Sequence, residues 1–249
     1  MIRAIIIDDE RLARVELRRL LTVHDEIEII GEAANITEAL QVIESLQPDL
    51  IFLDIQMPGG SGFDLLAKLD LAPEVIFTTA FDTYALKAFE VNALDYLQKP
   101  IEPPRLDAAL ARALQRFEKP TNARLASQLA TPQAKSGNDK IFIKDGERCW
   151  FVTLTDIMLF ESEGNYARVY FSTGLQTQRP LMLRSLNQLE ERLNPNQFFR
   201  ANRRQIINLQ FIDLVAPTDS GGLTIVLKNQ LRIELSRRRA TQFKELSTL

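Results

Sequence analysis

Cysteine and histidine are almost absent from this chain, which has one of each among its 249 residues. The single cysteine, Cys149, excludes a disulfide within the chain and any zinc site built from several cysteines. The single histidine, His24, excludes most of the zinc constellations of hydrolases. A histidine-dependent catalytic triad has to rest on His24 alone.

Long apolar runs are also missing. No stretch approaches the roughly 18 uncharged apolar residues of a membrane helix. The segment Met1–Glu10 lacks the basic flank, the long apolar core and the cleavage site of a signal peptide. Charged residues make up 25% and hydrophobic residues 45%, which excludes a disordered or collagen-like chain. We expect a cytoplasmic protein without membrane insertion and, at about 100–200 residues per domain, two domains.

The two halves of the chain differ in charge. Residues before Gly137 include 14 Lys and Arg against 21 Asp and Glu, a net charge of −7, and the rest include 16 against 12, a net charge of +4. The segment 119–139 contains two prolines and many polar residues, which indicates a linker. We therefore predict one domain at residues 1–118 and another at residues 140–249.

In the first half, short apolar runs alternate with segments of helical periodicity. This is the pattern of a parallel sheet covered by helices on both faces. Helical spacing is clear at Leu106, Leu110 and Leu114, for example. An α/β fold with a doubly wound, five-stranded parallel sheet is predicted. Its strands are expected at Arg3–Ile7, Glu28–Ala33, Leu50–Leu53, Glu74–Thr78 and Asp95–Gln98.

The second half changes to β-rich stretches separated by glycine turns, which predicts an all-β domain with short helices. Strands are expected at Lys140–Lys144, Cys149–Val152 and Arg168–Phe171. Ser185 followed by Gln188 fits a capping box at the start of one helix. Ser236 fits an N-cap for a closing helix at Arg237–Leu246.

Three carboxylates follow two of the predicted strands. Asp8 and Asp9 come directly after the first strand, and Asp54 comes directly after the third. Ligands of open α/β sheets bind at this edge, where the strands end. A hard divalent cation neutralises crowded carboxylates, and oxygen ligands favour Mg²⁺. On these three residues alone, ordinary loop carboxylates remain an alternative.

A hydroxyl and an ammonium are predicted at the same edge. Thr78 and Thr79 end the fourth strand, and Lys99 ends the fifth. Pro100 makes a cis peptide bond available after Lys99. A carboxylate nucleophile, a metal ion, a hydroxyl and a lysine are what attack on a phosphoryl group requires. The residues therefore predict phosphoryl chemistry with Asp54 as the nucleophile.

Four separated motifs stand in this half of the chain: IIIDDE, LIFLDIQMPGGSGFDLL, VIFTTA and DYLQKP. In this order and spacing they make residues 2–116 resemble the response-regulator receiver domain, which has a flavodoxin-like fold. The resemblance implies that Asp54 accepts a phosphoryl group from a sensor histidine kinase. Thr79 and Lys99 are implied to assist at the phosphoryl group.

The same resemblance implies a cofactor and a switch. The cofactor is Mg²⁺, with ligands Asp8 (mainly through a water molecule), Asp9, Asp54 and the backbone carbonyl of Gln56. Phosphorylation is implied to draw in the switch hydroxyl of Thr79, which frees space for Tyr96 to turn inward. This change is expected to promote a homodimer through the face around Asp82–Asn92 and Asp95–Arg116.

Arginines crowd two short segments of the basic half: Arg200, Arg203 and Arg204 in one, and Arg237, Arg238 and Arg239 in the other. The second group lies in the first turn of a predicted helix, where cations oppose the helix dipole by roughly 0.3–1 kcal/mol each. Tolerating this cost suggests an anionic partner. Arginines bridge phosphates and pair with guanine, so double-stranded DNA is favoured. A solvated positive face remains the alternative for either cluster by itself.

Further motifs resemble the LytTR DNA-binding domain of LytR/AlgR-type regulators: DIMLFESEGNYARVYF, LRSLNQLEERL, FFRANRRQIINLQFI and LRIELSRRR. This resemblance implies small antiparallel sheets and DNA contacts made by loops. The implied contact residues are Asn165, Tyr166, Arg168, Asn202, Arg203, Arg204, Arg237 and Arg238. Many relatives have His-Arg-Ser before an aromatic residue where this chain has Asn202, Arg203, Arg204 and Gln205. The resemblance therefore does not fix the recognised DNA sequence.

Together these patterns predict a two-component transcriptional regulator. Phosphorylation of Asp54 is expected to promote dimerisation and the binding of repeated DNA elements. No enzyme activity is expected beyond the self-phosphorylation and autodephosphorylation chemistry at Asp54. The main alternative is a Mg²⁺-dependent phosphohydrolase, but the acidic motif lacks the Asp-x-Asp spacing of haloacid-dehalogenase-type phosphatases, and no substrate cap is evident. A third interpretation makes the basic half an RNA- or protein-binding module.

Overall fold

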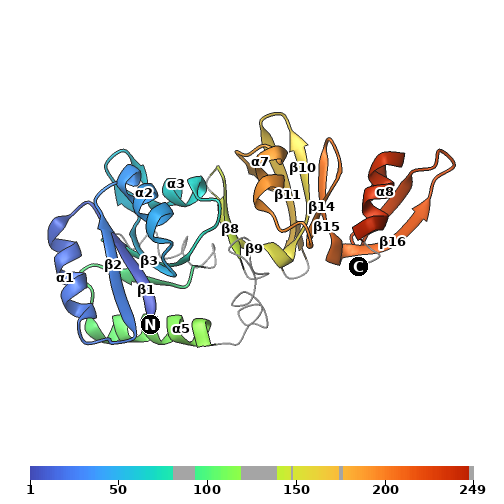
Figure 1. Ribbon diagram of the computed structural model, residues 1–249. Helices are drawn as coiled ribbons and strands as arrows, with labels where there is room; N and C mark the ends of the chain where they lie inside the picture. The colour runs from blue at the N-terminus through green and yellow to red at the C-terminus, as the bar shows by residue number, and fades with distance from the viewer. Residues whose placement is uncertain (81–92, 119–138, 147, 174–175, 247–249) are drawn as a thin grey trace. The chain divides into compact units, whose positions relative to one another are not determined.

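The computed structural model describes residues 1–80, 93–118, 139–146, 148–173 and 176–246 (Figure 1). These residues form two compact units. The first contains the described residues up to 118 together with Lys140–Phe151, and the second contains Asp139 and the residues from Val152 onwards. No helix in these ranges combines the length and the hydropathy that a membrane span needs.

Five parallel strands form the sheet of the first unit, in the order β2-β1-β3-β6-β7; Figure 1 labels β1, β2 and β3. They are β1 (Ile2–Ile7), β2 (Ile27–Ala33), β3 (Leu50–Asp54), β6 (Glu74–Thr79) and β7 (Asp95–Gln98). A short antiparallel pair, β4 (Gln56–Met57) and β5 (Gly60–Ser61), follows β3. The predicted five-stranded parallel sheet is confirmed, and each strand end lies within one residue of its expected place.

Helices cover both faces of this sheet: α1 (Arg11–Leu21), α2 (Ile36–Leu46), α3 (Gly62–Lys68) and α5 (Pro103–Glu118). Alternate strand residues point to opposite faces. Ile5 and Ile51 pack in the core with α2 and α3, whereas Ile6 and Phe52 pack in the core with α1 and α5. Because both faces are covered, the central strand β3 is a continuous apolar run up to Asp54.

A β-hairpin from the predicted second domain also packs in the core of the first unit. Its strands are β8 (Lys140–Asp145) and β9 (Arg148–Thr153). The side chain of Phe142 stacks on Phe63 of α3, with ring centroids 6.2 Å apart, and meets Phe151 edge-on at 4.9 Å. The sequence pattern predicts both strands but not the residues that they pack against. Alternation of apolar and polar residues shows only which face of a strand is apolar. The domain bounds 1–118 and 140–249 stay predictions.

Charged contacts fix the same hairpin. The Nζ atom of Lys140 lies 2.8 and 2.9 Å from the two carboxylate oxygens of Glu74, which begins β6. Lys144 donates to Asp64 of α3 at 2.5 Å. Partial burial raises the pKa of Asp64, but hydrogen bonds from Lys144 and from Ser61 outweigh it and lower that pKa to about 2. Ion pairs therefore join one end of β8 to β6 and the other end to α3.

The substitution Phe142→Ala tests this packing. Because Phe142 is only 2% exposed, its truncation is expected to lower the free energy of unfolding of the first unit by about 3–5 kcal/mol. The single tryptophan of the chain, Trp150, lies in β9, so its fluorescence during denaturation reports on the hairpin directly. Val23→Ala, at an exposed apolar position, is the control. A loss below about 1 kcal/mol for Phe142→Ala would show that the hairpin does not share this core.

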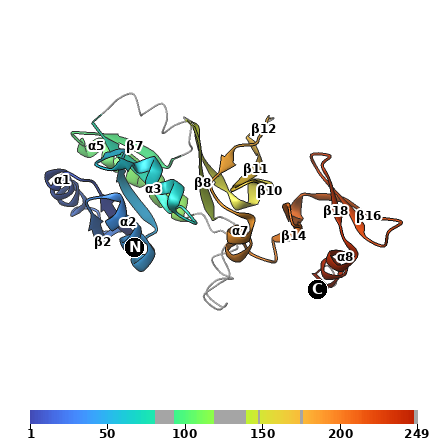
Figure 2. The same ribbon diagram turned by 90° about the horizontal axis from the view of Figure 1, so that it is seen from above.

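The second unit consists of small antiparallel sheets, as the sequence predicts (Figure 2). One has the order β12-β11-β10-β15-β14, with β13 paired to β11, and another has the order β16-β17-β18. The strands are β10 (Ile157–Glu163), β11 (Tyr166–Thr173), β12 (Gln176–Gln178), β13 (Leu181–Met182), β14 (Phe198–Asn202), β15 (Gln205–Asn208), β16 (Ile212–Pro217), β17 (Leu223–Leu227) and β18 (Arg232–Leu235). The 3-10 turn Leu154–Asp156 precedes β10, and the 3-10 turn Leu209–Phe211 connects β15 to β16.

The described residues of the second unit also form the helices α7 (Leu186–Arg192) and α8 (Arg237–Leu246). The predicted capping box at α7 is present, because Ser185 Oγ accepts from the backbone N–H of Gln188 while Gln188 Oε1 accepts from that of Ser185. On α8, Phe243 packs edge-on against Phe199 of β14, with ring centroids 5.5 Å apart. This contact joins α8 to the core of the sheets.

Candidate functional site

The acidic cluster of the first unit lies at the carboxyl edge of the parallel sheet. Asp8 follows β1, Asp54 ends β3, Thr79 ends β6 and Lys99 follows β7. Since β1 has β2 on one side and β3 on the other, the winding direction reverses here, and a ligand crevice is expected at such a point. A cavity of about 550 Å³ opens there. Its lining includes Asp8, Asp9, Asp54, Gln56, Thr78, Thr79 and Lys99.

Lys99 joins two buried carboxylates in this crevice. Its Nζ atom lies 2.7 Å from Asp8 Oδ2 and 2.9 Å from Asp54 Oδ2. The side chains of Asp8 and Asp54 are only 4% and 8% exposed. Burial raises the pKa of Asp8, although Lys99 partly opposes the effect. Burial lowers the pKa of Lys99, but hydrogen bonds to both carboxylates outweigh it and raise that pKa, so the ammonium stays charged.

The donor atoms present fit a magnesium ion. The carboxylate oxygens of Asp8, Asp9 and Asp54 lie within 4.8 Å of one another. The three carboxylates outnumber the cation of Lys99 that contacts them, and a divalent ion would neutralise the excess negative charge. All these donors are oxygen atoms, which is the ligand type that Mg²⁺ prefers. Gln56, whose carbonyl is the fourth predicted ligand, is also next to the cluster, and its N–H donates to Asp54 Oδ1 at 3.2 Å.

The predicted switch residues lie on neighbouring strands. Thr79 is fully buried at the end of β6, and its carbonyl accepts from the backbone N–H of Lys99 at 2.8 Å. Tyr96 is buried on β7, which pairs with β6. The Lys99–Pro100 peptide bond is cis. Of the predicted dimer face, β7 and α5 are described, whereas Asp82–Asn92 lies outside the described residues.

Arg14 also belongs to this site, although its sequence context does not distinguish it from its neighbours. Its side chain is 14% exposed and bridges the site to β2. Nη1 donates to the carbonyl of Asp8 at 2.6 Å, and Nε donates to Glu32 at 3.1 Å. Arg14 thus holds the segment that carries Asp8 and Asp9. In the sequence it is one of four arginines between residues 11 and 19, and only the three-dimensional structure distinguishes it.

The second unit brings the predicted DNA-contact segments together. Strand β10 pairs with β15 in antiparallel register, Glu161 opposite Gln205, so the end of β10 and the turn before β15 are neighbours. Ser162 N–H donates to the carbonyl of Arg204 at 2.8 Å. Asn202 Nδ2 donates to the carbonyl of Glu234 at 3.2 Å, close to the start of α8. Three segments far apart in the sequence therefore meet at one end of these sheets.

The predicted contact residues differ in exposure. The exposed ones are Asn165, Tyr166, Arg203, Arg204, Arg237 and Arg238. Arg168 and Asn202 are half-buried. Arg168 forms an ion pair with Glu163 and donates to the carbonyl of Arg179 at 3.0 Å. Arg237 Nε donates to the carbonyl of Ser220, so this side chain also contacts the loop between β16 and β17.

Family comparisons match each half of the chain separately. Residues 4–111 match the response regulator receiver domain, and residues 147–248 match the LytTr DNA-binding domain. The fold and the acidic crevice of the first unit, with the small antiparallel sheets of the second, have the architecture that these families imply. The protein is therefore a two-component transcriptional regulator.

Curated relatives match the chain along nearly its whole length. It is 36% identical over 247 residues to the transcriptional regulatory protein BtsR of Salmonella typhi, covering 98% of each chain. It is 33% identical over 251 residues to the sensory transduction protein LytT of Bacillus subtilis strain 168, covering 99% of each. The solved response regulatory domain of protein mrkE from Klebsiella pneumoniae is 32% identical, with 47% of this chain and 99% of that one covered and a TM-score of 0.44. The chain belongs to the response regulators that carry a LytTR DNA-binding domain.

Proposed function

We propose that a sensor histidine kinase phosphorylates this regulator at Asp54 and thereby promotes its dimerisation and its binding to repeated DNA elements. The observation that carries the proposal is the position of Lys99 between Asp54 and Asp8 in an open crevice. A buried carboxylate beside a fixed cation is suited to attack on a phosphoryl group, because the cation stabilises negative charge on the transferred oxygens.

In the proposed reaction, a carboxylate oxygen of Asp54 attacks the phosphorus atom, and the bond from phosphorus to the histidine nitrogen of the kinase breaks. Asp8, Asp9, Asp54 and the carbonyl of Gln56 would hold Mg²⁺. The ion supplies neutralisation of the phosphoryl charge. Asp8 also keeps Lys99 close to the crevice, since the two groups are only 2.7 Å apart.

Phosphorylation changes the charge at Asp54 from −1 to about −2 and adds strong acceptor oxygens. Lys99 and the hydroxyl of Thr79 are expected to turn toward the new group. Tyr96, on the strand beside Thr79, then turns inward and alters the face that contains β7 and α5. Moving a two-state equilibrium from 1:99 to 99:1 needs about 5.5 kcal/mol, which several charge-assisted hydrogen bonds and a dimer interface supply together.

The DNA-binding part of the proposal rests on the exposed arginines of two segments that share one end of the second unit. Arg203 and Arg204 lie on a hairpin turn, and Arg238 lies in the first turn of α8. A dimer presents two such surfaces, so binding to one element raises the effective concentration for the next. Affinity for repeated elements thus exceeds that for a single one.

Arg203→Ala is expected to weaken binding to a specific duplex by about 1–3 kcal/mol and to relax the choice of base at one position. The duplex is selected by the wild-type protein from a random-sequence pool, and affinities are measured by titration at fixed salt. Arg192→Ala removes an exposed arginine of α7 and serves as the control. An equal loss on every duplex would assign Arg203 to phosphate contacts, and no loss would remove it from the interface.

A further inference from the structure

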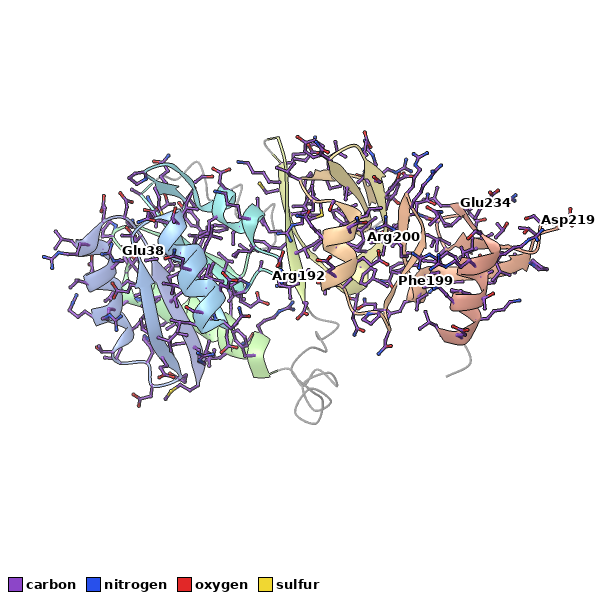
Figure 3. The ribbon with its side chains drawn as sticks, turned by 45° about the horizontal axis from the view of Figure 1, so that its top comes forward. Glu38, Arg192, Phe199, Arg200, Asp219 and Glu234 are labelled. Atoms are coloured by element: carbon purple, nitrogen blue, oxygen red, sulfur yellow. The ribbon has the colours of Figure 1, made fainter. Side chains whose placement is uncertain are left out.

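The second unit buries one arginine beside the proposed DNA-contact turn. Arg200 lies on β14 (Figure 3), and its side chain is 9% exposed, whereas Arg203 and Arg204 are exposed. Burying a guanidinium is unfavourable unless its donors find partners. The hydrogen bonds of the Arg200 guanidinium therefore indicate its role.

The guanidinium of Arg200 donates to two successive backbone carbonyls of the turn. Nε lies 2.7 Å from the carbonyl oxygen of Asn202, and Nη2 lies 2.8 Å from that of Arg203. The next carbonyl, of Arg204, accepts from Ser162 N–H of β10 at 2.8 Å. Three successive carbonyls of the turn are thus held, two of them by one side chain.

Side-chain bonds of Asn202 restrain the same turn. Its Oδ1 accepts from the backbone N–H of Arg204 at 2.9 Å, and its Nδ2 donates to Gln205 Oε1 at 3.0 Å and to the carbonyl of Glu234 at 3.2 Å. The backbone of the turn is therefore fixed, while the side chains of Arg203 and Arg204 extend from it into solvent.

The surroundings of Arg200 argue against a purely stabilising role. Its Nη1 is buried without a hydrogen-bond partner among the described residues, and the carboxylate of Glu190 on α7 is 3.6 Å away. Burial lowers the pKa of Arg200, Glu190 partly restores it, and Arg239 of α8 lowers it further. An apolar side chain at this position would avoid the free-energy cost of burying a charge and an unpaired donor. It would, however, make no hydrogen bonds to the carbonyls of Asn202 and Arg203.

We propose that Arg200 is a positioning residue for DNA recognition: its guanidinium holds the carbonyls of Asn202 and Arg203, and so directs the Arg203 and Arg204 side chains toward DNA. Contact groups that are already held in their bound geometry bind more tightly and more selectively. This inference rests on the proposed DNA-binding function of the second unit.

Arg200→Met tests the inference on the full-length protein, with the duplex that the wild type selects from a random pool and with an unrelated duplex. Affinity for the selected duplex is expected to fall roughly tenfold. Affinity for the unrelated duplex and the salt dependence of binding are expected to stay unchanged, since the buried side chain does not reach phosphate. Arg200→Lys keeps the charge but not the planar fork of donors, and it is expected to lose selectivity as well.

A double variant tests whether Arg200 acts through the turn. If it does, Arg200→Met combined with Arg203→Ala weakens specific binding by clearly less than the two separate losses together. Additive losses would overturn the proposal, as would equal losses on both duplexes with a salt slope reduced by about one, which marks a phosphate contact. Arg192→Met is the matched control and is expected to bind like the wild type.

Two outcomes separate this inference from the function on which it rests. A wild-type protein that selects no duplex overturns both. A wild type that selects a duplex which Arg200→Met binds equally well overturns the inference alone. Thermal unfolding shows whether Arg200→Met folds, and if it does not, Arg200→Lys is judged by the same criteria.

Discussion

Asp54→Asn is expected to abolish labelling of the protein by acetyl phosphate in the presence of Mg²⁺. The amide has nearly the same shape as the carboxylate, but it is a far poorer nucleophile and carries no charge for the metal ion or for Lys99, which lies 2.9 Å away. Labelling is measured with radioactive acetyl phosphate and located by peptide mapping. The loss is expected to be complete within detection.

Asp64→Asn is the matched control for this experiment. Asp64 is an aspartate of the same unit, but its carboxylate is bonded to Ser61 and Lys144 and lies outside the crevice. We expect this variant to label like the wild type. Full labelling of Asp54→Asn would contradict the assignment of Asp54 as the phosphoryl acceptor. Asp8 and Asp9 would then be the candidates for the acceptor.

Lys99→Met is expected to lower the free energy of unfolding of the first unit by about 3–5 kcal/mol at pH 7. The reason is that it leaves two buried carboxylates, Asp8 and Asp54, without their shared cation. Added Mg²⁺ is expected to recover part of the loss, since an ion that binds only the folded state stabilises it. Denaturant titrations with and without Mg²⁺ measure both effects.

The same variant has an expected pH dependence. The pKa of Asp8 is already raised by burial, and removal of Lys99 raises it further. A carboxyl whose folded pKa exceeds its unfolded pKa binds more protons when folded, so the folded state gains stability as the pH falls through the raised pKa toward the unfolded value of 3.8. The stability deficit of Lys99→Met should therefore be largest at pH 7 and smaller at pH 5.

Lys68→Met, at an exposed position of α3, controls for the loss of a lysine as such. It is expected to change stability by less than about 0.5 kcal/mol at either pH. An equal deficit for Lys99→Met at both pH values would show that Lys99 does not neutralise the buried carboxylates.

The fold of the first unit and the position of its acidic site could be predicted from the sequence pattern. Buried parallel strands are continuous apolar runs, and charged residues such as Asp8 and Asp54 mark where they end. Because parallel strands end at a common edge, residues after different strands are predicted to meet. The structure confirms this meeting, with Lys99 in contact with both carboxylates.

Other features depend on tertiary contacts that no local pattern shows. The alternation of β8 does not reveal that Phe142 stacks on Phe63. The helical position of Arg14 does not reveal its bond to the carbonyl of Asp8. Arg200 resembles its neighbouring arginines in the sequence, yet its burial separates it from the exposed Arg203. In each case the partner is distant along the chain or is a backbone atom. A backbone atom can be the partner whatever the side chain of its residue, so the sequence does not mark it.

Phosphorylation of Asp54 is expected to control DNA binding. This control is tested by measuring the affinity of the full-length protein for the selected duplex in Mg²⁺, with and without beryllofluoride as a phosphoryl mimic, for the wild type and for Asp54→Asn. We expect the mimic to tighten binding of the wild type at least tenfold, about 1.4 kcal/mol, and to leave Asp54→Asn unchanged. Equal affinity of the wild type with and without the mimic, or the same gain in the variant, would show that phosphorylation of Asp54 does not control DNA binding.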